Sequence, residues 1–366
     1  MSREYLSPRR AAREVRVGSV LIGGPAPIVI QSMNATDTRD VARTLAEIER
    51  LHAAGCQLTR VAIPDMAAAG ALNEIVRRSP LPVVADIHFD HRLAIAAVEN
   101  GAAKIRINPG NIGGETKLAA VVDCCRAHGV PIRVGVNAGS LSRDMLQKHG
   151  GISVPAMVES ALLAVRAVEA AGLDNIVISA KASDPALTIA VNRALARETD
   201  YPLHLGVTEA GTPERGRVRA AVALGTLLAE GIGDTIRISL TGDPVLEVEA
   251  AWTILQALGL VRRGATLVSC PTCGRTEVDL VPLAAELERR ISGIRRPLTV
   301  AVMGCPVNGP GEARAADVGI AGGRGEFLLF AKGEVLARVP EAEAVERLLQ
   351  LIAERFPEEE TDAQSG

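Results

Sequence analysis

The chain has 366 residues, of which 48% are apolar but only 2% aromatic, and its formal net charge is −3. This length fits one large domain plus a second unit, and the near-neutral charge gives no global reason to expect a nucleic acid or an anionic membrane as partner. The N-terminus is polar and has no secretory pattern. No apolar run approaches the roughly 20 residues of a spanning helix, and the six cysteines are too sparse for a disulfide framework. These features predict a cytoplasmic protein.

Short β-rich runs recur along the first two thirds of the chain, each followed by a stretch with apolar residues at helical spacing. They begin near Ile28, Leu58, Val83, Lys104, Ile132, Asn175, Leu203 and Thr235. Eight alternating units in about 240 residues match the size of a (β/α)8 barrel. An open doubly wound sheet is the alternative, but no GxGxxG fingerprint follows any of the runs.

A change of pattern after the eighth unit predicts a second domain. We expect the barrel over residues 1–258, a linker over 259–266, and a small α+β domain over 267–356. In that domain LTVAVMG and FLLFAKGE are typical of strands, and AEAVERLLQLIAERF of a closing helix. The polar, acidic residues 357–366 predict a disordered tail.

Several of the predicted barrel strands carry polar residues where a doubly buried strand should be apolar. These residues lie toward the C-terminal ends of the strands, which is the end where barrel enzymes place their sites. The candidates for substrate binding are Arg60, Asp86, His88, Arg106, Asn108, Arg133, Asn137, Lys181, Arg237 and Ser239. In the seventh strand, Thr208 and Glu209 are both plausible inward groups.

The charges on these strands are unbalanced. Six cations face only two carboxylates, Asp86 and Glu209, and the cations are Arg60, Lys104, Arg106, Arg133, Lys181 and Arg237. An uncompensated buried cation costs on the order of several kcal/mol. The simplest completion is a polyanionic small substrate, most simply a diphosphate, because arginine forks suit phosphate oxygens. A purely structural network of ion pairs is the alternative.

Three cysteines near the C-terminus have a spacing typical of a metal centre. Cys270 and Cys273 form a CxxC motif in SCPTCGRTEVDL, while VMGCPVNGPGEA contributes Cys305 and, seven residues later, Glu312. An Fe–S cluster is favoured, with zinc and a redox disulfide as alternatives. If three thiolates hold a four-iron cluster, Glu312 is the nearest candidate for the remaining ligand; the alternative is a solvated carboxylate after a turn.

The motifs together resemble the 4-hydroxy-3-methylbut-2-enyl diphosphate synthase family. The resemblance rests on VIQSM, RVAIP, ADIHF, KIRINPGNIG, IRVGVNAGSL, HLGVTEAG, RISLTGDP and the two cysteine motifs, in that order. One departure is Asn34–Ala35, where the family usually has Thr-Asn after QSM. That departure leaves the role of the first βα loop open.

The resemblance implies an oxidoreductase of the methylerythritol phosphate route to isoprenoids. Its reaction is the reductive ring opening and dehydroxylation of 2-C-methyl-D-erythritol 2,4-cyclodiphosphate. It implies a [4Fe–4S] cluster held by Cys270, Cys273, Cys305 and Glu312, with electrons from ferredoxin or flavodoxin. As hypotheses for catalysis, Glu312 is a ligand that gives way to the substrate, and Glu209 handles a proton.

The chain topology predicts an assembly. A last barrel helix of about 15 residues runs roughly 22 Å back to the opposite end of the barrel, and the linker spans at most about 27 Å. We therefore expect a head-to-tail homodimer, which the resemblance also implies. Two rival functions are a pterin-synthase-like barrel transferase with a zinc appendix and no redox step, and an Fe–S sensor that uses the barrel as a ligand receptor.

Overall fold

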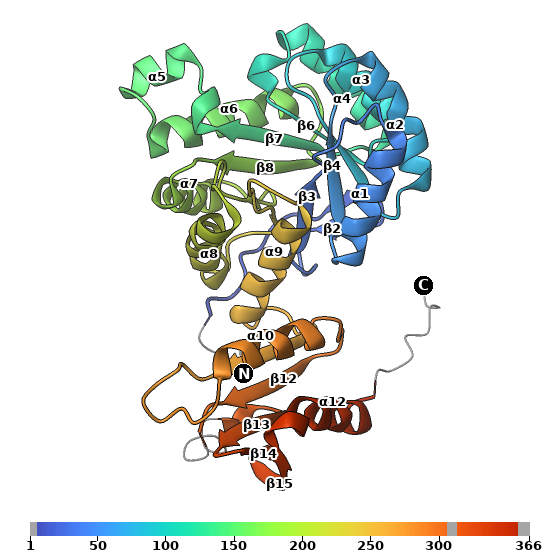
Figure 1. The fold of residues 1–366 in the computed structure, drawn as a ribbon. Coiled ribbons are helices and arrows are strands. Elements are labelled where there is room, and N and C mark those ends of the chain that lie inside the picture. Colours follow the sequence, from blue (N-terminus) through green and yellow to red (C-terminus); the bar gives the residue numbers. More distant parts are fainter. Residues whose placement is uncertain (1–5, 306–312, 358–366) are drawn as a thin grey trace. The chain divides into compact units, whose positions relative to one another are not determined.

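The computed structural model describes residues 6–305 and 313–357, and the chain forms two compact units, Met1–Leu260 and Val261–Gly366. Figure 1 shows both units. Glu312 and, apart from Pro357, the predicted tail lie outside the described residues. Within those ranges, no helix is both long enough and apolar enough to cross a membrane.

The first unit is a parallel barrel, as the sequence predicted. Its sheet has the strand order β8-β7-β6-β5-β4-β3-β10-β9. A parallel bridge between Ile178 of β8 and Leu203, the residue before β9, connects the two ends of this order. The strands are β3 (Val29–Met33), β4 (Leu58–Ala62), β5 (Val83–Asp86), β6 (Lys104–Ile107), β7 (Ile132–Asn137), β8 (Ile176–Lys181), β9 (His204–Leu205) and β10 (Thr235–Ile236). Each falls in one of the eight predicted runs.

Helices alternate with these strands and surround them (Figure 1). They are α1 (Val41–Ala53), α2 (Met66–Arg78), α3 (His91–Glu99), α4 (Glu115–His128), α5 (Arg143–His149), α6 (Val154–Ala170), α7 (Pro185–Glu198), α8 (Pro213–Ala229) and α9 (Val245–Ala257). Asp40, Asp65 and Asp90 cap the first three, each accepting a hydrogen bond from a backbone N–H of the first turn. Helix starts are therefore fixed just beyond the C-terminal ends of β3, β4 and β5.

A short hairpin that the sequence did not predict covers the other end of the barrel. It consists of β1 (Val15–Val17) and β2 (Val20–Ile22), which pair antiparallel. Val15, Val17 and Ile22 pack against Val29 and Leu58, the first residues of β3 and β4. Because the hairpin buries the N-terminal ends of these strands, the C-terminal ends remain for a site.

The second unit is an α+β domain with a mixed five-stranded sheet of order β11-β12-β13-β14-β15. The first three strands are parallel and the others antiparallel. The elements are β11 (Ala265–Ser269), α10 (Leu280–Ile291), β12 (Leu298–Met303), β13 (Val318–Gly323), β14 (Glu326–Ala331), β15 (Glu334–Pro340) and α12 (Ala344–Arg355). The predicted strands at 298–304 and 327–334 and the closing helix correspond to β12, β14 and α12.

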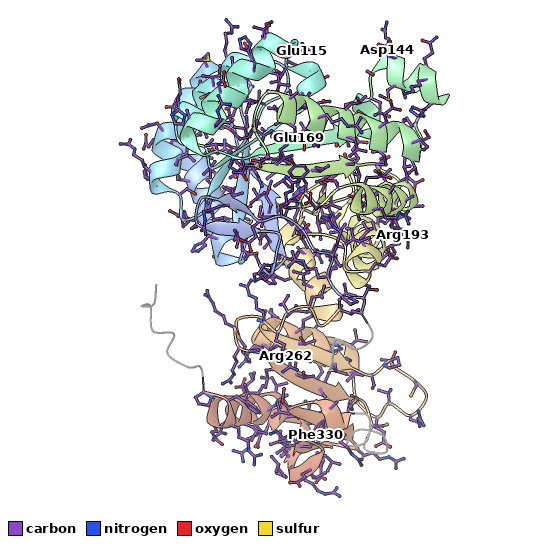
Figure 2. All side chains as sticks on the ribbon, turned by 180° about the vertical axis from the view of Figure 1, so that it is seen from behind. Glu115, Asp144, Glu169, Arg193, Arg262 and Phe330 are labelled. Atoms are coloured by element: carbon purple, nitrogen blue, oxygen red, sulfur yellow. The ribbon has the colours of Figure 1, made fainter. Side chains whose placement is uncertain are left out.

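Both helices of this unit contribute to one core. Leu287 of α10 and Leu348 of α12 are fully buried with Val300 and Ile320 of the sheet. Phe330 belongs to a second cluster and lies within the sheet (Figure 2). The strand β11 begins at Ala265, inside the predicted linker, because its first two residues pair in parallel with Leu298 and Thr299.

Candidate active site

The polar residues of the barrel strands meet in one cavity. It measures about 140 Å³ and contains nine of the ten predicted substrate-binding residues. The lining residues are Arg60, Asp86, His88, Arg106, Arg133, Asn137, Ser179, Lys181, Thr208, Arg237 and Ser239. Asn108 and Glu209 line a neighbouring pocket of about 460 Å³ that shares His88, Arg106, Asn137 and Thr208 with the first.

Strand register explains why these side chains converge. Asp86 is paired with Arg106, and Arg106 with Arg133, on three successive strands. Since side chains alternate across a strand, residues two positions apart point to the same interior. Glycine leaves room for the long cations: a Cβ at Gly135 would lie 2.4 Å from Arg106 Nε, and one at Gly206 would lie 2.8 Å from Lys181 Nζ.

Asp86 is the one carboxylate among the described residues that line the cavity. It is 4% exposed, with Oδ1 3.4 Å from Arg106 Nη1 and Oδ2 3.3 Å from His88 Nε2. Burial alone would raise the pKa of Asp86, but Arg60, the His88 hydrogen bond and Arg106 together hold that pKa well below its usual range. Asp86 is therefore ionised and holds neighbouring cations in place.

A second buried carboxylate, Glu247 of α9, was missed by the sequence analysis. Its Oε1 accepts hydrogen bonds from Arg237 Nη2 (3.1 Å) and the Leu240 N–H (3.0 Å), and its Oε2 accepts one from Ser32 Oγ (3.0 Å). The residue is 4% exposed. The sequence did contain a signal for this burial: Glu247 lies within the apolar stripe of the helix, with Val248, Ala250 and Ala251.

Glu209 was expected to face the cations, but it is exposed at the rim while Thr208 lines the cavity. Its backbone has φ of +54°, a left-handed conformation that is uncommon for a residue other than glycine. The sequence could not assign the parity of this strand because its regular part is only two residues long, His204–Leu205. Glu209 is placed beside Asn108 and His88 in the neighbouring pocket.

With Glu209 at the rim, the barrel interior remains strongly positive. Within the described residues, the six cations named from the sequence share the barrel interior with Asp86 and Glu247. Burial lowers the pKa of Arg60 to about 10. It also lowers the pKa of Lys181, and nearby arginines add to that effect. The cavity is therefore suited to a compact polyanion.

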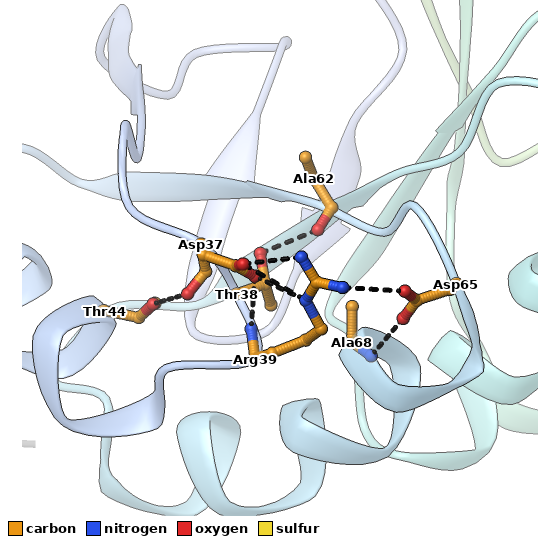
Figure 3. Close-up of polar contacts among 7 residues, drawn as sticks. All are labelled: Asp37, Thr38, Arg39, Thr44, Ala62, Asp65 and Ala68. Atoms are coloured by element: carbon orange, nitrogen blue, oxygen red, sulfur yellow. Dashed lines mark hydrogen bonds and ion pairs between the residues drawn. The ribbon is translucent and has the colours of Figure 1, made fainter.

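The first βα loop, which contains the departure Asn34–Ala35, is held by contacts within the loop and to its neighbours. Thr59 Oγ1 donates a hydrogen bond to Asn34 Oδ1 (2.5 Å), and the Ala35 N–H donates one to Glu47 Oε2 (2.8 Å). Figure 3 shows the next residues, where Arg39 bridges Asp37 and Asp65. Asn34 and Ala35 are not among the described residues that line the two pockets.

In the second unit, the cysteines follow two adjacent parallel strands. Cys270 comes directly after β11, and Cys305 lies two residues beyond β12. The Gly304 N–H donates a hydrogen bond to Cys270 Sγ at 3.2 Å, and the Glu277 N–H donates to the Gly304 carbonyl at 2.9 Å. These bonds hold the CxxC loop against the end of β12.

The cysteine thiols differ from one another in their surroundings. Cys273 is exposed, and the backbone N–H and guanidinium of Arg275 lower the pKa of its thiol. Burial, in contrast, raises the pKa of Cys56 and of Cys125 to about 12. A lowered pKa favours the thiolate, which is the form that binds metal and reacts with electrophiles.

The donor chemistry of Cys270, Cys273 and Cys305 fits an Fe–S cluster, because such clusters are held by thiolates. All three cysteines are free, and one accepts a backbone N–H bond of the kind that stabilises a thiolate. In the part of the chain that is described, no three His, Cys, Asp or Glu side chains are gathered as a metal-binding group. The expected fourth ligand, Glu312, is outside those ranges.

Both units match known families. The model of the GcpE TIM-barrel domain matches residues 12–252, and that of the GcpE protein C-terminal domain matches residues 266–354. A relative from Geobacter sulfurreducens, named 4-hydroxy-3-methylbut-2-en-1-yl diphosphate synthase (flavodoxin), is 58% identical over 337 residues, covering 92% of this chain and 96% of the relative. A relative of the same name from Caldanaerobacter subterraneus is 54% identical, covering 96% of this chain and 99% of the relative.

Proposed function

This chain belongs to the GcpE family, and from that premise we propose that it is a 4-hydroxy-3-methylbut-2-en-1-yl diphosphate synthase acting on 2-C-methyl-D-erythritol 2,4-cyclodiphosphate. Each turnover takes in two electrons and two protons. One ring carbon–oxygen bond breaks, a hydroxyl leaves as water, and a carbon–carbon double bond forms. The observation that carries the assignment to this substrate is the cavity, where five cations and the carboxylate of Asp86 are among the described lining residues.

The barrel residues bind and orient the diphosphate. Arg60, Arg106 and Arg133 present guanidinium groups that match phosphate oxygens, and Lys181 adds an amine on the next strand. Asn108 and Asn137 offer amide groups where the cavity meets the neighbouring pocket. Because Arg60, Arg106, Arg133 and Lys181 are each at most 8% exposed, their attraction for the bound anion is only weakly screened by water.

Glu209 is the proposed proton-handling group. It lines the pocket that adjoins the cationic cavity, so it would face the carbon skeleton while the diphosphate occupies the arginines. Its backbone is strained, and such a conformation is kept only where the surrounding structure holds the residue in place. Residues of this kind are common in functional sites. Asp86 does not fit this role, because the cations around it hold it ionised.

The second unit is proposed to hold a [4Fe–4S] cluster through Cys270, Cys273, Cys305 and Glu312. When bound, such a cluster supplies electrons one at a time. The names of the relatives specify flavodoxin, and we propose flavodoxin, rather than ferredoxin, as the donor. Six free cysteines are in keeping with a reducing compartment, so we place the protein in the cytoplasm.

We also propose a head-to-tail homodimer, in which the cluster unit of each chain serves the barrel of its partner. Helix α9 follows the last strand and returns the chain toward the barrel end opposite the cavity. Only residues 258–264 then separate α9 from β11. Mixing an Arg106→Ala protein with a Cys305→Ser protein should restore turnover that neither has alone; a mixture as inactive as its components would contradict this arrangement.

The test of the function is anaerobic turnover. Protein purified without oxygen is given reduced flavodoxin and the cyclic diphosphate, and the open-chain diphosphate is followed by phosphorus NMR. We expect product from the wild type and none from Arg106→Ala, whose iron content should be unchanged. Wild-type protein that retains its cluster but neither binds nor converts the cyclic diphosphate would contradict the proposal. The full-length match to synthases does not favour a transferase or a sensor.

A further inference from the structure

A second layer of polar side chains lies inside the barrel, deeper than the cavity. Lys104 and His204 are completely buried and Gln31 is 1% exposed. The three are not among the described residues that line the cavity. Lys104 Nζ, His204 Nε2 and Gln31 Nε2 have no hydrogen-bond partner within the described residues. A buried polar atom without a partner is costly, so this layer needs an explanation.

Strand geometry places Lys104 directly under the phosphate-binding cations. Lys104 precedes Arg106 by two residues on β6, so both side chains point into the interior at successive levels. Its register partner on β5 is Val84, which precedes Asp86 by two residues. Lys104 therefore sits one layer below the Asp86–Arg106 pair.

The charged groups that face Lys104 are cations. Arg133 of β7 and Arg60 of β4 act on it most strongly. Lys104 in turn acts on His204 of β9, whose pKa is lowered by burial and by these cations, so that its neutral form is favoured. Lys181 of β8 and Arg237, the residue after β10, line the cavity above. The interior carboxylates are engaged elsewhere, Asp86 with Arg106 and His88, and Glu247 with Arg237.

Burial and these cations act on Lys104 in the same direction. Burial lowers the pKa of Lys104 well below its usual value, and Arg133 and Arg60 lower it further. The neutral amine is therefore favoured while the cavity above is without an anion. A bound polyanion would offset the charge of the arginines and attract an ammonium group, so both effects of the anion would favour protonation of Lys104.

We propose that Lys104 is a buried proton acceptor, neutral in the free protein, that takes up a proton when a phosphate-like polyanion fills the cavity above it. Lys104 is thus a positioning residue that adjusts the charge of the site without touching the substrate. The identity of the natural anion rests on the proposed function, but the proton uptake does not. Because a proton is gained on binding, affinity for the anion should rise as the pH falls.

Sulfate is the appropriate probe, because it remains a dianion throughout the pH range of the experiment and carries no proton of its own. Calorimetric titrations of the full-length protein at pH 8.5, in two buffers of different ionisation enthalpy, give the number of protons taken up. At this pH ordinary histidine side chains are already neutral. Uptake by Lys181 is common to all the variants compared.

The variants to compare are Lys104→Met, Lys104→Gln and Lys148→Met. We expect both Lys104 variants to take up at least about half a proton less than the wild type, and to lose most of the rise in sulfate affinity between pH 9.5 and pH 8, which for one proton amounts to roughly tenfold or more. Lys148 is exposed on α5 and pairs with Glu159, so its variant should match the wild type. Replacing a buried, unpartnered amine with an apolar group should preserve folding, and Lys104→Gln provides a second neutral side chain.

Equal proton uptake in wild type and both Lys104 variants would overturn the inference, and so would a wild type that takes up no proton on binding sulfate. These results are separable from a failure of the proposed function. Turnover with unchanged uptake would remove only the role of Lys104. Uptake that depends on Lys104, in a protein that does not convert the cyclic diphosphate, would leave the role of Lys104 standing without the proposed reaction.

Discussion

Arg237 and Glu247 are joined inside the barrel by two contacts, Nη2 to Oε1 at 3.1 Å and Nε to Oε2 at 3.3 Å. The same carboxylate accepts hydrogen bonds from Ser32 and from the backbone of Leu240. Glu247 therefore fixes the direction of a cavity arginine and also ties α9 to β3 and to the segment after β10. A single carboxylate couples the fold to the site.

Glu247→Gln should weaken both the orientation of Arg237 and the attachment of α9 to the barrel. The amide removes the charge that orients Arg237, so we expect kcat/KM for the cyclic diphosphate to fall about tenfold or more. We also expect the free energy of unfolding to fall by about 1–3 kcal/mol, because buried hydrogen-bonding groups lose their partner. Steady-state kinetics and urea denaturation measure the two effects.

Glu249→Gln is the matched control for this change. Glu249 lies on the same helix but is exposed, and its nearest cation is Arg217 at 3.7 Å. A surface pair of this kind contributes little, so its loss should change stability by less than about 1 kcal/mol. If the two variants behave alike, Glu247 does not organise the site.

Two substitutions of Glu209 should separate its effect on turnover from its effect on stability. Glu209→Ala should leave the cluster spectrum intact and reduce turnover about 10²-fold or more. Glu209→Gly should lose turnover equally, yet be at least as stable as the alanine variant, because glycine adopts the left-handed conformation at φ +54° without strain. Normal turnover in either variant would remove Glu209 from the reaction.

Asp86 should make the barrel sensitive to acid. A carboxylate whose pKa is depressed in the folded state contributes stability that is fully present above its unfolded pKa, about 3.9, and is lost as the pH falls below it. Asp86→Asn should lower the free energy of unfolding at pH 7 by about 3–5 kcal/mol, because a buried ion pair is broken.

The difference between the wild type and Asp86→Asn should then narrow in urea titrations below about pH 4. Asp123→Asn is the control, since Asp123 forms an exposed pair with Arg126 at 2.6 Å. A gap between wild type and Asp86→Asn that stays constant from pH 7 to pH 3 would show that Asp86 does not have the depressed pKa expected of it.

Cys273 should be the most reactive thiol of the cluster-free protein. Because Arg275 lowers the pKa of this thiol, the thiolate forms at lower pH, and alkylation by iodoacetamide should reach half its maximal rate at a lower pH than for an ordinary thiol. Cys56 and Cys125, with pKa values raised to about 12 by burial, should stay unmodified in the folded protein.

Mass spectrometry of quenched samples follows each cysteine separately. Arg275→Ala should move the pH–rate profile of Cys273 upward, and loading the cluster should protect the thiol. An unshifted profile in Arg275→Ala would remove the role of the arginine.

The sequence predicted the inward residues well where the strands are regular. Asp86, Arg106, Arg133 and Lys181 were found because alternation along a strand of at least four residues leaves one choice of face. The same rule failed for Glu209, since the seventh strand has only two regular residues. Deciding which side chains of a strand point inward requires a longer regular strand than this one.

Other features depend on contacts that no local pattern contains. The burial of Glu247 is set by the packing of α9 against the barrel, and the sequence shows only a glutamate among apolar neighbours. The hairpin of β1 and β2 was missed because strands of three residues show no periodicity. In the second unit, the predicted linker over 259–266 included the first two residues of β11, because these residues are strand only through pairing with β12.

The central claim is that a cationic barrel cavity and a cysteine-held cluster act together in one reductive reaction. The most direct measurement combines iron and acid-labile sulfide analysis with turnover of the cyclic diphosphate, on the same anaerobic preparation. The account predicts about four iron and four sulfide per chain, with product formed by the wild type, and loss of both the cluster and product formation in Cys305→Ser. Protein without iron that still converts the substrate, or protein with a full cluster that never binds it, would contradict the account.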